Sequence, residues 1–248
     1  MILSLLNVKL NLSNYSEAFS FALTCINEKR SGYFVFSNPH SVMLCRRNPE
    51  MMKSTSSALL VLPDGIGIIL IAKVFGYKCN RVTGPSFMLY ACDNGRNNKI
   101  RHYFYGGTNE ILKKLRQKLL DRYPGIIISG MHSPPFQEQD HIAIDKEIEN
   151  INNSYSDIIW VGLGAPKQEI WMNKYASRIR PGVMMGVGAA FDFHSGGKLW
   201  APFIFRYLGI EWIWRLAFNP IRMWPRSVDG IKFIFLSFYE MTFKKHEK

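Results

Sequence analysis

The sequence lacks the residue patterns of a metal site and of a disulfide framework. It contains no Asp-x-Asp, no His-x-x-x-His and no His-Glu-x-x-His, and its six histidines are scattered along the chain. The four cysteines form no Cys-x-x-Cys pair: they are Cys25, Cys45, Cys79 and Cys92. We therefore expect free thiols, no bound metal and no cofactor.

A secretion signal and a membrane-spanning segment are also missing. The start, MILSLLNVKL, has no basic first region and no small-residue cleavage site. The most apolar stretch, 203–218, is interrupted by Arg206, Glu211 and Arg215, and it is shorter than the roughly 18 to 20 apolar residues that cross a bilayer. We expect a cytoplasmic protein, in which this stretch could lie on a membrane surface rather than cross it.

Acidic residues are scarce. The 248 residues include 31 Lys and Arg against 19 Asp and Glu, which gives a formal net charge of +12. Residues 198–248 alone carry nine of the basic and four of the acidic side chains. This balance favours a polyanionic partner, which could be nucleic acid, an acidic membrane surface or a phosphorylated substrate. With 47% hydrophobic residues the chain can bury a substantial core, which excludes a wholly disordered protein.

Short apolar runs that end in Gly or Pro alternate with amphipathic stretches. The runs predict six buried strands, at 33–37, 58–62, 103–105, 126–129, 157–161 and 183–187. The clearest helix is 109–123, where apolar side chains recur on one face and lysines on the other. The alternation predicts a Rossmann-like α/β fold, with a mostly parallel sheet and helices on both faces. Such sheets bind ligands at the C-terminal ends of their strands.

The pattern changes after Gly197. Aromatic and Arg-rich helical segments follow without a further strand, and we expect breaks at Pro202, Pro220 and Pro225. We therefore expect an α/β domain at 1–197 and a helical appendage at 198–248. Tryptophan and arginine together suit a membrane interface, which is apolar below and phosphate-rich above. The alternative is a helix docked on the core, with arginine stems covering apolar surface.

Asp64 follows the second predicted strand, in the sequence PDGIG at 63–67. An isolated carboxylate at a strand end is a candidate general base, and the two glycines let a ligand approach the backbone. The alternative is that Asp64 caps the next helix by accepting hydrogen bonds from its first amides. The residues alone leave both interpretations open.

Another strand end, at Gly164, leads into a predicted helix with Pro166 at its first position. Free amides and the positive end of the helix dipole suit a phosphate there, and Lys167 adds charge. The segment matches neither Gly-x-Gly-x-x-Gly nor Gly-x-x-x-x-Gly-Lys-Ser/Thr, because Pro166, Lys167 and Gln168 stand where glycines are required. An NAD-dependent enzyme is therefore weakly supported.

A third strand end and two lesser signals complete the candidates. Asp192 follows the last predicted strand and could accept hydrogen bonds from ribose or sugar hydroxyls, but a turn aspartate before two glycines is the alternative. Gly106 and Gly107 end another strand, and Phe136 could offer an aromatic face to a base. The glycine pair and Phe136, each taken alone, are more often turn or core residues than part of a site, whereas the two interpretations of Asp192 stay open.

Six segments are distinctive when they are read together: PDGIG at 63–67, RVTGP at 81–85, FYGG at 104–107, VGLGAPKQE at 161–169, GVGAAFD at 186–192 and GIEWIWRL at 209–216. In this combination the chain resembles the TagA/WecG/CpsF family of bacterial glycosyltransferases. The resemblance runs from about residue 37 to residue 226 in uninterrupted order. The PKQE and GIEWIWRL segments are specific rather than generic.

The resemblance implies that 1–197 is a glycosyltransferase catalytic domain, inverting and independent of metal. Such an enzyme moves a sugar from a UDP-sugar donor, typically of the UDP-N-acetylmannosamine type, onto a polyprenyl-diphosphate-linked sugar. The implied place is the inner face of the cell membrane, with peripheral attachment, and the products feed cell-wall or surface polysaccharides. The sequence leaves open whether the chain forms a homo-oligomer.

The resemblance also implies roles for individual residues. Asp64 matches the proposed base and Asn38 an asparagine near it, while Gln168 matches a glutamine beside the donor and Asp192 an acid near the nucleoside. Arginines that meet the lipid diphosphate are matched by Arg215, Arg222 and Arg226. The other candidate donor contacts are Arg81, Gly84, Gly106, Gly107, Phe136, Gly164 and Lys167.

Two positions depart from the family pattern. Ser86 stands where many members have Asp. Leu199 lies in the segment KLWAP at 198–202, where an arginine commonly precedes Ala-Pro, and Lys198 is the candidate substitute for that cation. The donor sugar therefore does not follow from the resemblance. A nucleic-acid-binding module without catalysis is the rival interpretation of the charge. We expect no nucleic-acid partner, because the basic excess lies in a tryptophan-rich segment and no nucleic-acid motif occurs.

Overall fold

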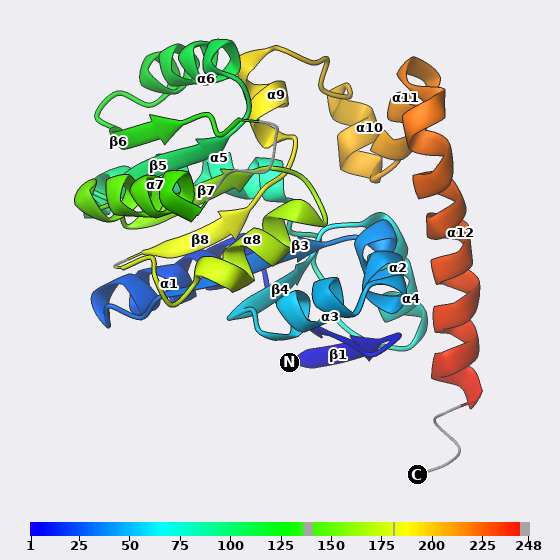
Figure 1. Cartoon of the computed structure of the whole chain (residues 1–248). Helices are drawn as coiled ribbons and strands as arrows, with labels where there is room; N and C mark the ends of the chain where they lie inside the picture. Colours follow the sequence, from blue (N-terminus) through cyan, green and yellow to red (C-terminus); the bar gives the residue numbers. More distant parts are fainter. Residues whose placement is uncertain (136–140, 181, 244–248) are drawn as a thin grey trace. The chain divides into compact units, whose positions relative to one another are not determined.

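The computed structural model describes residues 1–135, 141–180 and 182–243 (Figure 1). By its internal contacts the chain forms two compact units, each assembled from separate stretches of sequence. Unit 1 comprises Met1–Asn14, Phe36–Thr83 and Leu199–Lys248, and unit 2 comprises Tyr15–Val35 and Gly84–Lys198. One boundary thus lies next to the predicted end of the α/β domain. Residues 199–248, however, group with two earlier stretches, so the division into 1–197 and 198–248 stays a prediction.

All six predicted strands are present, and the α/β fold is confirmed. They form one sheet in the order β4-β3-β8-β7-β5-β6. The pairs β3–β8, β8–β7, β7–β5 and β5–β6 are all parallel. The strands are β3 (Gly32–Ser37), β4 (Leu60–Pro63), β5 (Arg101–Gly106), β6 (Ile127–His132), β7 (Ile158–Gly162) and β8 (Val183–Gly186).

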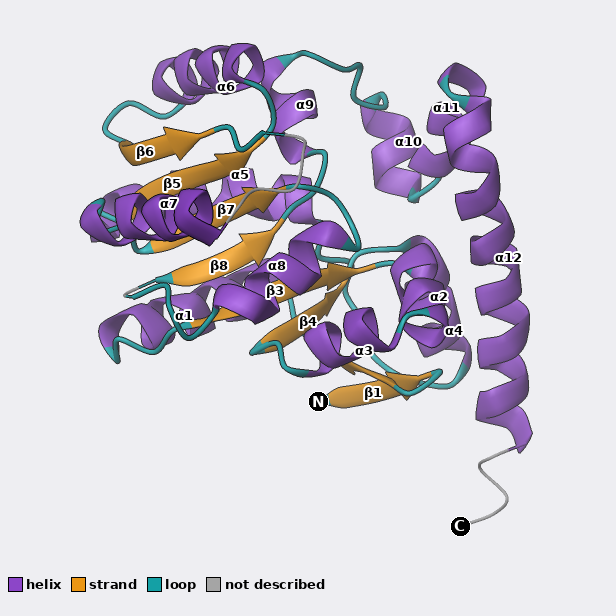
Figure 2. Ribbon diagram, in the orientation of Figure 1, coloured by secondary structure: helices purple, strands orange, loops and turns teal. Residues whose placement is uncertain are grey.

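Unit 2 carries helices on both faces of its part of the sheet. Figure 2 shows α7 and α8 in front of the strands and α5 behind them, while α1 packs against β8 and α5. The predicted helix at 109–123 is confirmed as α6, with Leu112, Leu115 and Leu119 buried and Thr108 as its N-cap. The helices are α1 (Tyr15–Asn27), α5 (Gly84–Asn94), α6 (Asn109–Arg122), α7 (His141–Asn153), α8 (Lys167–Tyr175) and α9 (Ala190–Ser195).

Unit 1 begins with an antiparallel hairpin that the sequence reading missed, β1 (Ile2–Leu5) and β2 (Val8–Asn11). Each strand has only four residues, too few for a clear alternation signal. The long helix α12 packs against α2, α4 and β1. The helices are α2 (Pro39–Arg47), α3 (Pro49–Ser56), α4 (Ile66–Val74), α10 (Phe203–Leu208), α11 (Glu211–Phe218) and α12 (Pro220–Phe243).

The three prolines of the C-terminal segment have different roles. Pro202 is the N-cap of α10 and Pro220 opens α12, as breaks would. Pro225 was wrongly expected to break the chain, because it lies inside α12. Near the start of a helix proline removes one backbone hydrogen bond, and packing of the other turns outweighs that loss. No helix of the described residues is long and apolar enough to span a bilayer.

Candidate active site

Asp64 lies in the turn between β4 and α4, in unit 1. Its backbone N–H donates to the carbonyl of Ser37 at 2.8 Å. Gly65 follows, and a Cβ there would lie 2.2 Å from Cδ of Pro39 and 3.1 Å from Cβ of Asn38. Only glycine lets the turn lie this close to the start of α2, so Asp64 and Asn38 are brought together. Gly65 also occupies the N-cap position of α4, so Asp64 is not the cap residue that the alternative required.

Asn38 is the N-cap of α2. Its Oδ1 accepts from the backbone N–H of Ser41 at 3.1 Å, and Oγ of Ser41 accepts from the backbone N–H of Asn38 at 2.8 Å. This reciprocal cap fixes the side chain. Within the described part of the chain the amide nitrogen of Asn38 has no hydrogen-bond partner, and it can donate to a ligand.

Arg81 donates to three protein groups of unit 1. Its Nε donates to the carbonyl of Asp64 at 2.6 Å, and its Nη1 to the carbonyl of Arg206 at 2.8 Å. Its Nη2 lies 2.6 Å from Oε1 of Glu211 and 4.0 Å from Oδ1 of Asp64. The sequence analysis named Glu211 only as a charge within the apolar stretch 203–218 and as part of GIEWIWRL, so it missed the contact of Glu211 with Arg81. The predicted donor contact of Arg81 stays a prediction.

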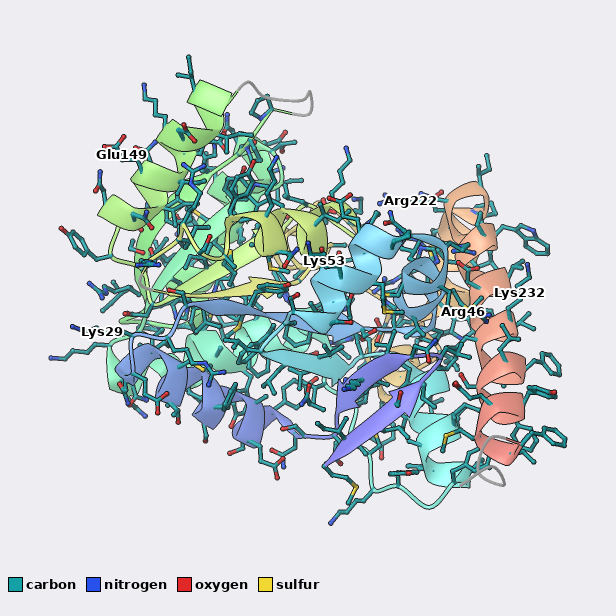
Figure 3. The ribbon with its side chains drawn as sticks, turned by 60° about the horizontal axis from the view of Figure 1, so that its bottom comes forward. Lys29, Arg46, Lys53, Glu149, Arg222 and Lys232 are labelled. Atoms are coloured by element: carbon teal, nitrogen blue, oxygen red, sulfur yellow. The ribbon has the colours of Figure 1, made fainter. Side chains whose placement is uncertain are left out.

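The three arginines predicted to meet a lipid diphosphate form one cluster in unit 1. Burial and the positive charges of Arg222 and Arg215 lower the pKa of Arg226. Arg222 is exposed at the start of α12 (Figure 3). Arg215 donates to Oε2 of Glu211 at 3.2 Å. Mutual repulsion of three guanidinium groups is relieved by an anion, so the cluster can bind a phosphate group.

Glycine turns follow β5, β7 and β8 in unit 2. A Cβ at Gly106 would lie 2.7 Å from the carbonyl of Gly162, so the ends of β5 and β7 approach closely only with glycine there. Gly164 has a φ of +81°, a conformation that favours glycine. Gly107 shares the turn after β5, while Gly84 is buried at the start of α5. The predicted glycines after β5 and β7 thus lie at the C-terminal ends of adjacent strands, where parallel sheets bind ligands.

Gln168 joins two of these turns. Its buried Oε1 accepts from the backbone N–H of Gly164 at 3.1 Å and from that of Gly188 at 3.0 Å. Its Nε2 donates to Oε1 of Glu169 at 2.8 Å. The side chain of Gln168 therefore links the backbones of the two loops that carry Gly164 and Gly188. Its predicted contact with the donor stays a prediction.

Glu169 is a buried acid that the sequence reading left without a role. Burial raises its pKa to about 7. Its Oε1 accepts from Gln168, and its Oε2 has no hydrogen-bond partner in the described part of the chain. A carboxyl group on this residue fixes which way the amide of Gln168 points, because only the NH₂ end can donate to it. Glu169 therefore orients the side-chain amide of Gln168.

The other candidates of unit 2 are placed differently. Pro166 is the N-cap of α8 rather than its first helical residue, and the exposed Lys167 begins the helix. Asp192 lies in α9 and forms an ion pair with Lys198, a partner that the sequence reading mentioned only as a substitute cation. Phe136 lies outside the described residues. No group of three or more His, Cys, Asp and Glu side chains that could hold a metal ion occurs among those described.

Comparison with known proteins gives concordant matches. A model of the glycosyl transferase WecG/TagA/CpsF family matches residues 3–247. A protein of Bacillus spizizenii is 30% identical over 212 residues, which cover 85% of this chain and 80% of the relative. It is named N-acetylglucosaminyldiphosphoundecaprenol N-acetyl-beta-D-mannosaminyltransferase.

Two further relatives carry the same name. That of Bacillus subtilis is 28% identical over 224 residues, 90% of this chain and 83% of its own length. That of Staphylococcus aureus strain NCTC 8325 is 28% identical over 218 residues, 87% of this chain and 81% of its own length.

Proposed function

Since the chain belongs to the WecG/TagA/CpsF family of glycosyl transferases, we propose that it transfers an N-acetylmannosamine-type sugar from UDP onto lipid-linked N-acetylglucosamine. The acceptor is the N-acetylglucosaminyl diphosphate of a polyprenol, the compound in the names of the relatives. The observation that carries the proposal is Asp64 at the end of β4, beside Asn38 and bonded through its carbonyl to Arg81. A carboxylate in this position can act as the general base.

In the proposed reaction Asp64 takes the proton of an acceptor hydroxyl. The oxygen attacks the anomeric carbon from the face opposite UDP, a new C–O bond forms, and the bond to UDP breaks with its electron pair leaving on the diphosphate. One displacement inverts the anomeric centre and needs no covalent intermediate. General-base assistance of this kind contributes about 10²- to 10⁴-fold to the rate.

Unit 2 supplies the groups suited to the donor. The backbone amides around Gly164 and at the start of α8, with Lys167, stabilise the negative charge on the departing diphosphate without a metal ion. Asp192 accepts hydrogen bonds from nucleoside hydroxyls. The hydrogen bonds of Gln168, whose amide Glu169 orients, support this donor site because they fix the loops that carry Gly164 and Gly188.

Unit 1 supplies the groups suited to a lipid-linked acceptor at a membrane surface. The arginine cluster Arg215, Arg222 and Arg226 binds the lipid diphosphate. Large apolar side chains on α10 to α12 are exposed, and they insert among lipid chains while the arginines meet phosphate. The most exposed of them are Phe203, Ile204, Tyr207, Phe218, Ile221, Trp224, Phe235 and Tyr239.

The test is a donor screen with the purified full-length protein. UDP-N-acetylmannosamine, UDP-N-acetylglucosamine and UDP-glucose are each incubated with a synthetic N-acetylglucosaminyl diphosphate lipid, and products are read by mass spectrometry. We expect one added N-acetylhexosamine from the first donor only. Transfer from another donor alone would correct the sugar. No transfer from any donor, with binding of single-stranded DNA instead, would overturn the enzymatic proposal.

A further inference from the structure

His40 adjoins the turn that carries Asp64. It is the second residue of α2, directly after Pro39. Pro39 packs closely against that turn, because a Cβ at Gly65 would lie 2.2 Å from its Cδ and a Cβ at Gly67 would lie 3.0 Å from its Cγ. The first turn of α2, and His40 with it, is therefore fixed beside the turn of the proposed base.

The same histidine adjoins the arginine cluster of α12. Figure 1 shows α12 alongside α2, and Nδ1 of His40 lies 2.6 Å from Oδ2 of Asp229 in α12. Burial lowers the pKa of His40, the hydrogen bond with Asp229 opposes this, and the positive charges of Arg226 and Arg47 add to the lowering. Arg226 belongs to the cluster proposed to bind the lipid diphosphate, so His40 adjoins both that cluster and the turn of the proposed base.

The hydrogen bonds of Asp229 decide which ring nitrogen of His40 is left to bind a ligand. Its carboxylate accepts from both terminal nitrogens of Arg47, at 2.7 and 2.6 Å, and an ionised carboxylate can only accept. Nδ1 of His40 therefore donates to Asp229, and the neutral ring keeps its lone pair on Nε2. Among the residues that the structure describes, Nε2 has no hydrogen-bond partner, and solvent reaches it in a side chain that is 22% exposed.

The acceptor of the proposed reaction carries its sugar between two groups that unit 1 binds. One is the hydroxyl that gives its proton to Asp64, and the other is the diphosphate that meets the arginines. A residue that adjoins both places is positioned to contact the sugar ring. Sugar hydroxyls and the acetamide N–H donate hydrogen bonds, which a neutral imidazole nitrogen accepts, whereas ionised phosphate oxygens have no hydrogen to donate.

We infer that His40 is a binding residue for the sugar of the acceptor, and that a hydroxyl or the acetamide N–H of this sugar donates to its Nε2. The inference rests on the proposed function, which supplies the acceptor. Asp229 and Arg47 are positioning residues behind His40, because they hold the ring with its hydrogen on Nδ1. Since Asp229 belongs to α12, the contact that ties α12 to α2 also prepares the acceptor site.

The test is binding of a short-chain N-acetylglucosaminyl diphosphate lipid to the full-length protein at pH 7.5, measured by calorimetry. Two substitutions separate the ring nitrogens, because the amide of asparagine takes the place of Nδ1 and that of glutamine the place of Nε2. His40→Asn keeps the bond to Asp229 and loses the sugar, so we expect Kd to rise about 3- to 10-fold. His40→Gln keeps an acceptor for the sugar, so Kd stays within about 2-fold of the wild type.

A lipid diphosphate without a sugar distinguishes a sugar contact from a phosphate contact. We expect its Kd to be the same in His40→Asn and in the wild type, whereas Arg226→Gln weakens binding of both lipids. Glu149→Gln, at an exposed position in α7 (Figure 3), is the control and binds both lipids as the wild type does. Thermal unfolding verifies that each variant is folded. A histidine that only supports the fold would give the reverse order, with Gln worse than Asn.

Four results would overturn the inference: no binding of the sugar-bearing lipid by the wild type, a wild-type Kd in His40→Asn, equal weakening for the sugar-free lipid, or weaker binding in His40→Gln than in His40→Asn. If His40→Asn does not fold, nitrogen-15 NMR of the wild type replaces it. The Nε2 resonance of His40 then moves with the sugar-bearing lipid only, and an unmoved resonance contradicts the contact. Failure of the proposed function is seen separately, as absence of transfer in the donor screen, because binding is measured without turnover.

Discussion

The carboxylate of Asp229 in α12 accepts hydrogen bonds from both terminal nitrogens of Arg47 in α2, at 2.7 and 2.6 Å. Nδ1 of His40 lies 2.6 Å from the same carboxylate, and the side chain of Asp229 is only 5% exposed. This cluster ties α12 to α2 within unit 1. Because α2 begins at the cap residue Asn38, the same contact supports the neighbourhood of Asp64.

Removal of the Asp229 charge will destabilise unit 1. We expect Asp229→Asn to lower the free energy of unfolding by about 2 kcal/mol at pH 7, because charge-assisted hydrogen bonds are lost. Burial acts to raise the pKa of Asp229, but the hydrogen bonds from Arg47 and His40 outweigh it and hold the pKa below 3.8. The contribution is therefore present above pH 3.8 and is lost as pH falls through the folded value.

Urea unfolding at several pH values checks this prediction. The gap between the wild type and Asp229→Asn narrows toward low pH if the ionised carboxylate is responsible. A gap that is equally large at the acid end would contradict it. Exposed Asp121→Asn in α6 serves as control, since its carboxylate accepts a hydrogen bond from Gln117 on the exposed surface of the helix.

Substitution of the proposed base will abolish most turnover. We expect Asp64→Asn to lower kcat about 10²- to 10⁴-fold, because the amide cannot accept the acceptor's proton. The carbonyl of residue 64 still accepts from Arg81, so the fold persists. Initial rates with donor and a soluble acceptor analogue give the comparison. A kcat within 2-fold of wild type in a folded variant would remove the base from the mechanism.

The buried acid Glu169 makes stability depend on pH. Burial raises its pKa to about 7, so the folded state keeps a proton that the unfolded state releases near pH 4.5. The contribution of the bound proton to the free energy of unfolding is therefore fully present below about pH 4.5, and it is lost as pH rises through 7. The Glu169→Gln variant carries no titratable proton at this position. We therefore expect its free energy of unfolding to rise relative to that of the wild type between pH 4.5 and pH 7, by up to about 3 kcal/mol.

Thermal unfolding at pH 4.5, 6 and 7.5 measures this relative gain. The exposed Glu149→Gln provides the comparison without burial, and its difference from wild type stays flat with pH. A flat difference for Glu169→Gln as well would show that Glu169 titrates normally in the folded chain.

The exposed apolar face of α12 will decide binding to lipid. Ile221 is 91% and Trp224 is 64% exposed. We expect Ile221→Glu with Trp224→Glu to weaken binding to anionic vesicles at least about 10-fold, because apolar insertion is lost and negative charge is added. Turnover of a soluble acceptor analogue remains within about 2-fold of wild type.

Vesicle flotation at low and high salt measures the effect. The matched control is Ile142→Glu in α7, which is 79% exposed in unit 2 and leaves binding unchanged. Equal loss in the control would indicate a general charge effect. Salt weakens binding of the wild type if the arginines contribute.

Much of the fold could be predicted because it is encoded locally. The run 158–161 is buried throughout and α6 repeats its leucines on one face, so periodicity alone predicted both. Glycines at strand ends also predicted the turns after β5 and β7. The backbone there has a positive φ or lies close to a neighbouring strand, and a residue with a Cβ fits neither arrangement. The β1–β2 hairpin escaped prediction because each strand spans only four residues.

The contacts around the candidate site were decided by tertiary structure. Arg81 and Glu211 are 130 positions apart, and Arg47 and Asp229 are 182 apart. No local pattern marks which charge meets which over such separations, because the pairing depends on how helices pack. Residue types and periodicities thus determined the strands, the α6 helix, the strand-end turns and the identity of Asp64 as a candidate base. Only folding decided that Arg81 is divided between Asp64 and the α10–α11 corner, because burial selects partners by position in space.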